Sequence, residues 1–210
     1  MNRLRVNDIF YSLQGEGHHT GRAAVFVRLS GCNLACPFCD TDFSSFQMMT
    51  EEDVLQAIHR LLPANTSLLA PRSPLPAPRL HPSSFMIILT GGEPTLQNTE
   101  PLIDLLHQQG FFVSMETNGT HQLPSNLDWS TVSPKTSVAI DRCNELKLVF
   151  TENCRPEQYL HVKADYYYLQ PCDTGDPERN RAIIDQCIGY IQTHPLWRLS
   201  LQVHKLAGFK

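Results

Sequence analysis

Residues 85–89 read Phe-Met-Ile-Ile-Leu, an uninterrupted apolar run that passes directly into Thr90-Gly91-Gly92-Glu93-Pro94. A strand with one face in water alternates apolar and polar residues, whereas a strand of a parallel sheet is covered on both faces and is apolar throughout. The run therefore predicts a central strand of a parallel sheet. The two glycines after it predict a loop whose backbone can approach a ligand closely.

The rest of the chain alternates predicted strands and helices. Further strands are expected at 23–29, 111–116, 129–133, 145–150, 166–170 and 197–202, because these runs are rich in β-branched and aromatic residues. Helices are expected over 50–63, where Asp53 completes a capping box with Thr50, from about 102 to a C-cap at Gly110, and over 178–193. This alternation predicts an α/β fold with a mainly parallel sheet.

The length and the charge of the chain narrow its class. With 210 residues, of which 41% are hydrophobic, we predict a single domain, 1–210, in which the proline- and serine-rich stretch 63–84 is a surface insertion. The formal charge of −4 provides no basic field for nucleic acid. No apolar run approaches the ~20 residues of a membrane span. We therefore expect neither nucleic acid nor membrane as a partner, and a cytoplasmic location.

Three of the seven cysteines, Cys32, Cys36 and Cys39, have the spacing C-x3-C-x2-C. A [4Fe–4S] cluster usually takes four thiolates, so three closely spaced ligands leave one iron open to another molecule. A zinc site is an alternative, although structural zinc prefers four ligands in two pairs. A disulfide framework fits neither the odd count nor the length of the chain. The other cysteines are predicted to be buried apolar residues: Cys143, Cys154, Cys172 and Cys187.

Polar or glycine-containing segments follow nearly every predicted strand, at 31–32, 90–94, 116–119, 133–135 and 170–173. Because ligands of parallel α/β proteins bind at the carboxyl ends of the strands, we expect these segments to face one site. Glu93, beside the two glycines, is interpreted as an acceptor for the ammonium group of an amino acid. Each segment alone is equally typical of an ordinary turn.

Charged residues inside predicted strands are further candidates. Glu145 and Lys147 share one strand face, and we interpret them as buried charges that serve a partner or a ligand; an edge strand with both charges in water is the alternative. Arg28 shares a face with Phe26 and is interpreted as a ligand for a substrate carboxylate, or else as a side chain that reaches solvent. The loop 12–17, Ser-Leu-Gln-Gly-Glu-Gly, is a candidate for binding a small polar molecule.

The cysteine spacing, Phe38 before the last cysteine, and the Gly91-Gly92-Glu93-Pro94 strand end resemble the radical S-adenosylmethionine (SAM) enzymes. Within that superfamily the chain is similar to the 7-carboxy-7-deazaguanine synthases over almost its whole length. The matching segments are 13–17, 39–41, 116–119, 132–135, 144–147, 169–171, 198–202 and 204–205. Val203, where relatives often carry threonine, the tail 206–210 and the stretch 63–84 depart from the family pattern.

The resemblance implies a small, abridged (β/α) barrel and a defined reaction. Cys32, Cys36 and Cys39 would bind a [4Fe–4S] cluster whose free iron chelates SAM, and the reduced cluster would cleave SAM to a 5′-deoxyadenosyl radical. The radical would take hydrogen from C6 of 6-carboxy-5,6,7,8-tetrahydropterin, after which the ring contracts and ammonia leaves. The product, 7-carboxy-7-deazaguanine, belongs to 7-deazapurine (queuosine) biosynthesis, and SAM would be regenerated.

The resemblance also assigns residues and partners. SAM is expected at Phe38, Asp40, Gly92, Ser133, Pro134, Lys135, Gln170, Pro171, Cys172 and Asp173. The pterin is expected at Leu13, Gln14, Gly15, Arg28, Thr90, Glu116 and, through its carboxylate, Lys210. Mg²⁺ is expected at Thr41, although its preference for carboxylates alone would favour Asp40 or Asp42. An external one-electron reductant, such as a flavodoxin-like protein, and a homodimer are the implied partners.

Two other functions would share the cysteine motif. A radical SAM activating enzyme for a glycyl-radical protein would have the same motif and a similar size, but it gives the loop 13–17 no role. A zinc or iron–sulfur module without enzymatic activity would leave 91–93 and the pair Glu145 and Lys147 without a purpose. Iron and sulfide analysis of anaerobically purified protein separates such a module from the enzymes.

Overall fold

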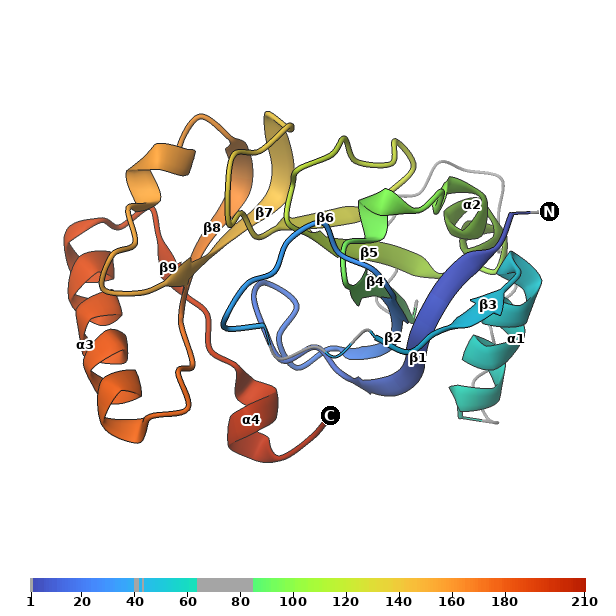
Figure 1. Ribbon diagram of the computed structural model, residues 1–210, viewed down its shortest axis with the longest axis horizontal. Helices are drawn as coiled ribbons and strands as arrows, with labels where there is room; N and C mark the ends of the chain where they lie inside the picture. Colours follow the sequence, from blue (N-terminus) through green and yellow to red (C-terminus); the bar gives the residue numbers. More distant parts are fainter. Residues whose placement is uncertain (1, 40–41, 43, 64–84) are drawn as a thin grey trace.

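The computed structural model describes residues 2–39, 42, 44–63 and 85–210 (Figure 1). Apart from Pro63, the predicted insertion 63–84 lies outside the described residues, as do the predicted ligands Asp40 and Thr41. The described residues form one nine-stranded sheet in the order β3-β1-β2-β4-β5-β6-β7-β8-β9.

The strands are β1 (Leu4–Leu13), β2 (Ala23–Leu29), β3 (Gln47–Met49), β4 (Met86–Gly91), β5 (Phe112–Thr117), β6 (Trp129–Val132), β7 (Arg142–Phe150), β8 (Lys163–Pro171) and β9 (Arg198–Leu199). The α-helices are α1 (Glu51–Leu61), α2 (Glu100–Gln108), α3 (Pro177–Thr193) and α4 (Val203–Ala207). Two short 3₁₀ helices, η1 (Pro94–Leu96) and η2 (Pro156–Tyr159), follow β4 and β7. In Figure 1, α1 and α2 lie at one end of the sheet and α3 lies at the other.

Every strand from β4 to β9 runs parallel to its neighbours, and β2 is parallel to β4. Only β1 and β3, at one side of the sheet, pair in the antiparallel sense. The predicted α/β class with a mainly parallel sheet is therefore confirmed. Because the strand order places β3 and β9 at opposite edges, the sheet is an open, partial barrel.

The structure differs from the sequence-based expectation at both edges of the sheet. The antiparallel strands β1 and β3 were not predicted, and the strand expected over 197–202 is reduced to Arg198 and Leu199. Residues 203–207 instead form α4. Beyond β9, the N–H group of Ser200 still donates to Leu169 O of β8 at 2.9 Å, and the N–H group of Val203 then donates to Gly15 O at 2.9 Å.

The predicted capping box of α1 is present. Thr50 Oγ1 accepts from the N–H group of Asp53 at 3.1 Å, and the Asp53 carboxylate accepts from the N–H group of Thr50 at 3.0 Å. These bonds satisfy donors that a helix start leaves unpaired and fix where the helix begins. Val54 and Ile58 then point into the core.

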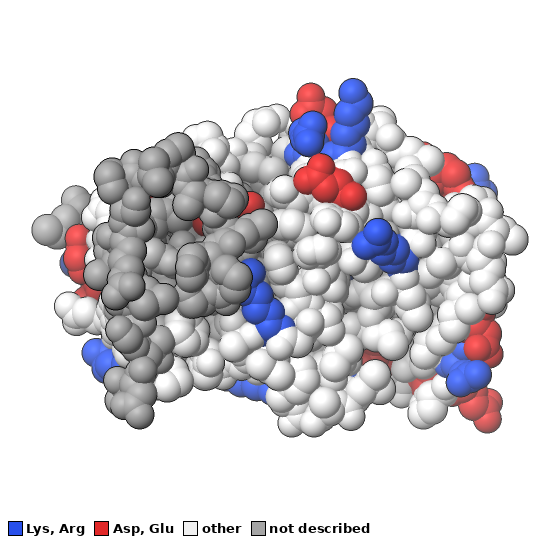
Figure 2. Space-filling model, turned by 180° about the vertical axis from the view of Figure 1, so that it is seen from behind, with Lys and Arg blue, Asp and Glu red and all other residues white. Residues whose placement is uncertain are grey.

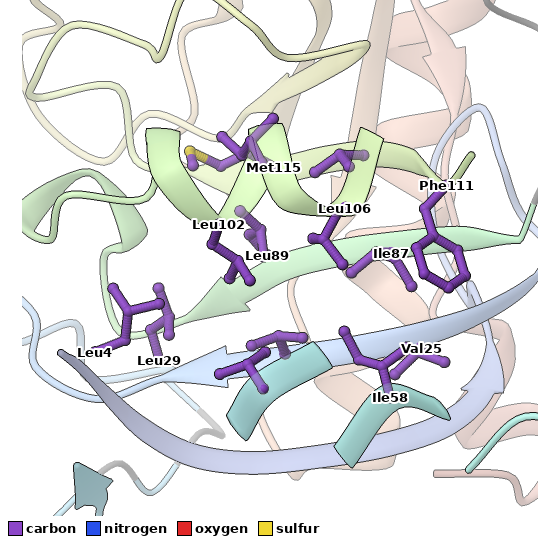
Figure 3. Packing of buried hydrophobic residues seen from close by; sticks show 14 of the residues in the cluster. Leu4, Val25, Leu29, Ile58, Ile87, Leu89, Leu102, Leu106, Phe111 and Met115 are labelled. Carbon is purple, nitrogen blue, oxygen red and sulfur yellow. The ribbon is translucent and has the colours of Figure 1, made fainter. Parts of the chain in front are cut away.

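The main core lies between the sheet and the helices α1 and α2 (Figure 3). Alternate residues of β2 and β4 contribute to it, among them Val25, Leu29, Ile87 and Leu89, all of which are fully buried. They pack against Ile58, Leu102 and Leu106 of the helices. A second cluster packs α3 against β7 and β8.

The other face of the sheet changes from apolar to polar along each strand. At the amino end its residues are the apolar set Ala24, Phe26, Met86, Ile88, Phe112 and Trp129. Because side chains alternate with period two, the same face continues toward the carboxyl ends with Arg28, Thr90, Glu116, Thr131, Lys147 and Gln170. The inner face thus has an apolar amino end and a polar carboxyl end, where the predicted site lies.

Two histidines pack against the apolar amino end of the inner sheet face. The ring of His18 stacks on Trp129 with centroids 4.8 Å apart, and the ring of His19 lies edge-on to Trp129 at 4.5 Å. Burial lowers the pKa of both histidines, that of His19 to about 4. Both side chains are therefore neutral aromatic packing groups near pH 7.

On the face shown in Figure 2, the Lys and Arg side chains of the described residues stand singly or beside acidic ones rather than in one basic patch. Among the described helices, none is long and apolar enough to span a membrane.

Candidate active site

The cysteine loop leaves the end of β2 and is held against the end of β4 by backbone bonds. The N–H group of Gly92 donates to Leu29 O and that of Glu93 donates to Gly31 O, both at 2.8 Å. A Cβ atom on Gly92 would lie 2.0 Å from Gly31 O. Gly92 is therefore required for the close approach of these two strand ends.

Glu93 has a structural role at the ends of two neighbouring strands. Its carboxylate is 1% exposed and accepts from the N–H group and hydroxyl of Thr95, the hydroxyl of Thr117 and the N–H group of Asn118. Three of these donors bond to Oε1 and the fourth, the N–H group of Asn118, bonds to Oε2. Glu93 thus joins the carboxyl ends of β4 and β5, and its interpretation as a ligand for an ammonium group stays a prediction.

A side-chain link extends this junction to the cysteine loop. Asn118 Nδ2 donates to Asn33 Oδ1 at 3.0 Å, and Asn33 Nδ2 donates to Thr120 Oγ1 at 2.8 Å. Since Asn33 directly follows Cys32, the loop is positioned by the strand end of β5 as well as by that of β4.

The three cysteines line one cavity of about 240 Å³ at the carboxyl ends of the strands. All three are thiols outside any disulfide, and the N–H group of Leu34 donates to Cys32 Sγ at 3.4 Å. Burial raises the pKa of the Cys36 thiol, while the charge of Lys135 acts in the opposite direction. Three soft thiol ligands beside a cation and a backbone donor fit an iron–sulfur cluster.

Most of the residues predicted to bind SAM line this same cavity: Phe38, Gly92, Ser133, Lys135, Gln170, Pro171, Cys172 and Asp173. Pro134 lines a neighbouring cavity that also borders Cys36 and Phe38. The structure thus brings the ends of β2, β4, β6 and β8 together around one space, as expected from the parallel sheet. Their contacts with SAM remain predictions.

A second cavity of about 380 Å³ adjoins the first. It is lined by every residue predicted to bind the pterin: Leu13, Gln14, Gly15, Arg28, Thr90, Glu116 and Lys210. Glu16, Thr90, Glu116 and Lys205 line both cavities. A molecule in the second cavity would therefore share a wall with one in the first.

Arg28 lies in β2, an internal strand, and its side chain lines the second cavity. Its guanidinium carbon stands 5.3 Å from the centre of the Phe10 ring. Among the described residues, its buried Nε atom has no hydrogen-bond partner. A buried donor without a partner is costly, so Arg28 is a candidate for binding an anionic ligand, and its contact with the pterin carboxylate stays a prediction.

Glu116 is oriented by three neighbours. Gln14 Nε2 donates to Oε1 at 2.9 Å, Thr90 Oγ1 donates to Oε2 at 3.1 Å, and Lys147 Nζ stands 3.9 Å from Oε1. These contacts hold the Glu116 carboxylate in the wall that the two cavities share.

Glu145 and Lys147 are 2% and 5% exposed, and β7 lies between β6 and β8, so the edge-strand alternative is wrong. Each has its own partner: Lys147 binds Glu16, and Glu145 accepts from the N–H group of His18 at 3.0 Å.

These contacts shift the pKa values of the carboxylates. Burial raises the pKa of Glu16, but the charge and hydrogen bond of Lys147 outweigh the effect of burial and lower that pKa to about 2. Burial also raises the pKa of Glu145.

The C-terminal segment contributes side chains to which the sequence reasoning gave no role. Gln202 and Lys205 line the first cavity, and His204 and Lys205 line the second. Lys205 Nζ donates to Asp173 Oδ2 at 2.8 Å, and Gln202 Nε2 donates to Glu16 Oε1 at 3.1 Å. The family resemblance at 198–205 was the only signal for them.

An open, mainly parallel α/β barrel with a C-x3-C-x2-C loop at the carboxyl ends of its strands is the architecture of a radical SAM enzyme. The cofactors of this class are a [4Fe–4S] cluster and SAM.

Comparisons with known proteins narrow the class. The chain is 43% identical to 7-carboxy-7-deazaguanine synthase of Bacteroides thetaiotaomicron over 208 residues, which cover 98% of each chain. It is 41% identical to the enzyme of the same name from Bordetella pertussis, covering 97% of each chain. The crystal structure of QueE from Escherichia coli superposes with a TM-score of 0.68 at 28% identity, covering 96% of this chain and 95% of that chain. No family model matches the chain. The chain belongs to the 7-carboxy-7-deazaguanine synthase family of radical SAM lyases.

Proposed function

We propose that the protein converts 6-carboxy-5,6,7,8-tetrahydropterin to 7-carboxy-7-deazaguanine and ammonia in queuosine biosynthesis. Substrate and product differ by one molecule of ammonia, so the reaction needs no net oxidant. The observation that carries the proposal is that all the residues expected at the pterin line one cavity, which shares Thr90 and Glu116 with the cavity of the cysteines.

Cys32, Cys36 and Cys39 would hold the cluster, which supplies the electron that cleaves SAM to a 5′-deoxyadenosyl radical. The walls around them, from Ser133 to Lys135 and from Gln170 to Asp173, would hold SAM. The backbone of Gly92 lies close to the cysteine loop. The chain's own contribution is to place the reacting atoms of the two ligands against each other and to exclude water between them.

The charges of the second cavity match the pterin. Arg28 would bind the carboxylate of the substrate, because a guanidinium binds a carboxylate with two parallel hydrogen bonds. Glu116 would accept hydrogen bonds from the N–H groups of the pterin ring, since Gln14 and Thr90 fix both of its oxygens. The carbonyl oxygen of Lys210 accepts from Ser12 Oγ at 2.6 Å, which keeps the tail beside this cavity.

Several further assignments belong to the same proposal. Mg²⁺ would bind at Thr41, where the substrate would supply a negative oxygen. The chain would work as one catalytic domain with 63–84 as an insertion, as a homodimer, with an external one-electron donor such as a flavodoxin-like protein. Sedimentation of the anaerobically purified enzyme tests the dimer.

An anaerobic assay with reductant, SAM, Mg²⁺ and the carboxytetrahydropterin tests the reaction. We expect the deazaguanine product, and none from a Cys36→Ala variant. Arg28→Gln should raise KM for the pterin, whereas Arg142→Gln, which removes an exposed cation from β7, should leave it unchanged. Cleavage of SAM without the deazaguanine product would overturn the substrate assignment.

A further inference from the structure

Glu16, which lines both cavities, forms an ion pair with Lys147, which lines the first, and the function proposed above gives neither residue a role. Their side chains are 18% and 7% exposed. Removing two charges from water costs free energy that their mutual attraction often does not recover. Their presence therefore calls for an explanation other than stability.

We propose that Lys147 is a positioning residue for the substrate. It holds the substrate loop, residues 14–18, against β7 through Glu16, and it keeps Glu116 at the shared wall of the cavities. The inference rests on the proposed function, because it takes the second cavity to be the pterin site.

The substrate loop lies directly on two inward side chains of β7. Lys147 donates to Glu16 Oε2, and Glu145 Oε2 accepts from the N–H group of His18. Gly17 has a φ of +64°, and a Cβ atom there would lie 2.0 Å from Glu145 Oε1. The loop therefore fits this close to β7 only with glycine at that position.

The C-terminal segment holds the same loop from another direction. Gln202 donates to Glu16 Oε1, Ser200 Oγ accepts from the N–H group of Gly17 at 3.0 Å, and Val203 donates to Gly15 O. Each oxygen of Glu16 thus has a partner on a different element. Without Lys147, Oε2 of Glu16 would lose the charged donor that it now accepts from.

Lys147 also interacts electrostatically with three carboxylates. Burial acts to lower its pKa, but Glu16, Glu116 and Glu145 raise that pKa above its usual value, so the ammonium stays charged. The charges of Lys135, at the end of β6, and of His204, in α4, also act on Glu16. Loss of Lys147 would leave Glu16 and Glu116 to repel each other, which would displace the acceptor that binds the pterin.

The variant Lys147→Met tests the inference, because methionine keeps most of the length of the side chain and removes its charge. Arg142→Met is the matched control, since it removes a cation from the same strand, where the side chain is 73% exposed. Affinities for SAM and for the carboxytetrahydropterin are measured separately, by anaerobic titration calorimetry without reductant. We expect pterin affinity to fall on the order of tenfold or more in Lys147→Met, SAM affinity to change less than about twofold, and both to stay unchanged in the control.

The isosteric variant Glu16→Gln provides a second route if Lys147→Met fails to fold. If Lys147 acts through Glu16, Glu16→Gln should also weaken pterin affinity, and the double variant should lose no more than the worse single variant, because the two residues form one unit. Equal pterin affinity in wild type and either single variant would overturn the positioning role. Wild-type enzyme that binds SAM but no pterin would instead overturn the proposed function.

Discussion

Replacement of Glu93 by Gln separates two roles that this carboxylate could have. The sequence suggests an acceptor for the ammonium group of an amino acid, a group that SAM carries, whereas the structure gives Glu93 four protein donors. The two roles predict opposite results, because a ligand affects SAM affinity and a structural junction affects stability. We expect the structural result.

The magnitude follows from the geometry. In glutamine one carboxylate oxygen becomes an N–H₂ group. If the remaining oxygen stays with Thr95 and Thr117, the new nitrogen faces the N–H group of Asn118, which now donates to Oε2 at 2.7 Å. The variant loses a hydrogen bond to a charged group and leaves a buried donor unsatisfied, at a combined cost of about 3–5 kcal/mol. For a chain of this size that cost lowers Tm by roughly 6–20 °C.

Thermal unfolding of the anaerobically purified enzyme, with and without SAM, measures both quantities. Glu52→Gln is the control, because it makes the same chemical change at an exposed position of α1 and should cost under about 1 kcal/mol. At a temperature where Glu93→Gln is folded, its SAM affinity should match that of wild type. A Tm equal to wild type together with weakened SAM binding would refute the structural role.

Three further predictions follow from the fold. Leu89→Ala, at a fully buried core position, should reduce the free energy of unfolding in urea by about 2–5 kcal/mol. Gly92→Ala should reduce the iron content and SAM binding, because its Cβ would collide with Gly31 O and separate the cysteine loop from β4; unchanged iron would contradict that view of the loop. His19 has a pKa of about 4 in the fold and 6.5 unfolded, so its contribution to stability is complete above pH 6.5 and is lost as the pH falls toward 4. His19→Phe should flatten this part of a plot of Tm against pH.

Much of the sheet could be predicted because its signals are local. The apolar run 85–89 became β4, an internal strand, and the capping box at Thr50 became the start of α1. The edges were harder to predict, since the pairing of β1 with β2 and β3 depends on segments distant in the sequence. After the short β9, Val203 bonds to Gly15, a contact that no local pattern contains.

The candidate site also has features that could be predicted from the sequence and features that could not. Residues at strand ends, such as Thr90 and Glu116, could be assigned to one region because parallel strands place their carboxyl ends together. The partners of the charged side chains could not be predicted in this way. The sequence placed Glu145 and Lys147 on one face, but the register of β7 against the substrate loop decides that Lys147 binds Glu16 and that Glu145 binds the backbone of His18.

The shared wall of the two cavities explains why so many distant segments meet at Glu16. Transfer of a hydrogen atom between two bound molecules requires their reacting atoms to be adjacent, and a displacement of about 1 Å can cost on the order of 100-fold in rate. A loop held only by its own turns would not keep that precision. Here Glu16 is bonded to Lys147 of β7, which lies 131 positions away in the sequence, and to Gln202 of the C-terminal segment, which lies 186 positions away. Since Lys205 of the same segment also bonds to Asp173 in the first cavity, a shift of the tail would move the walls of both cavities together.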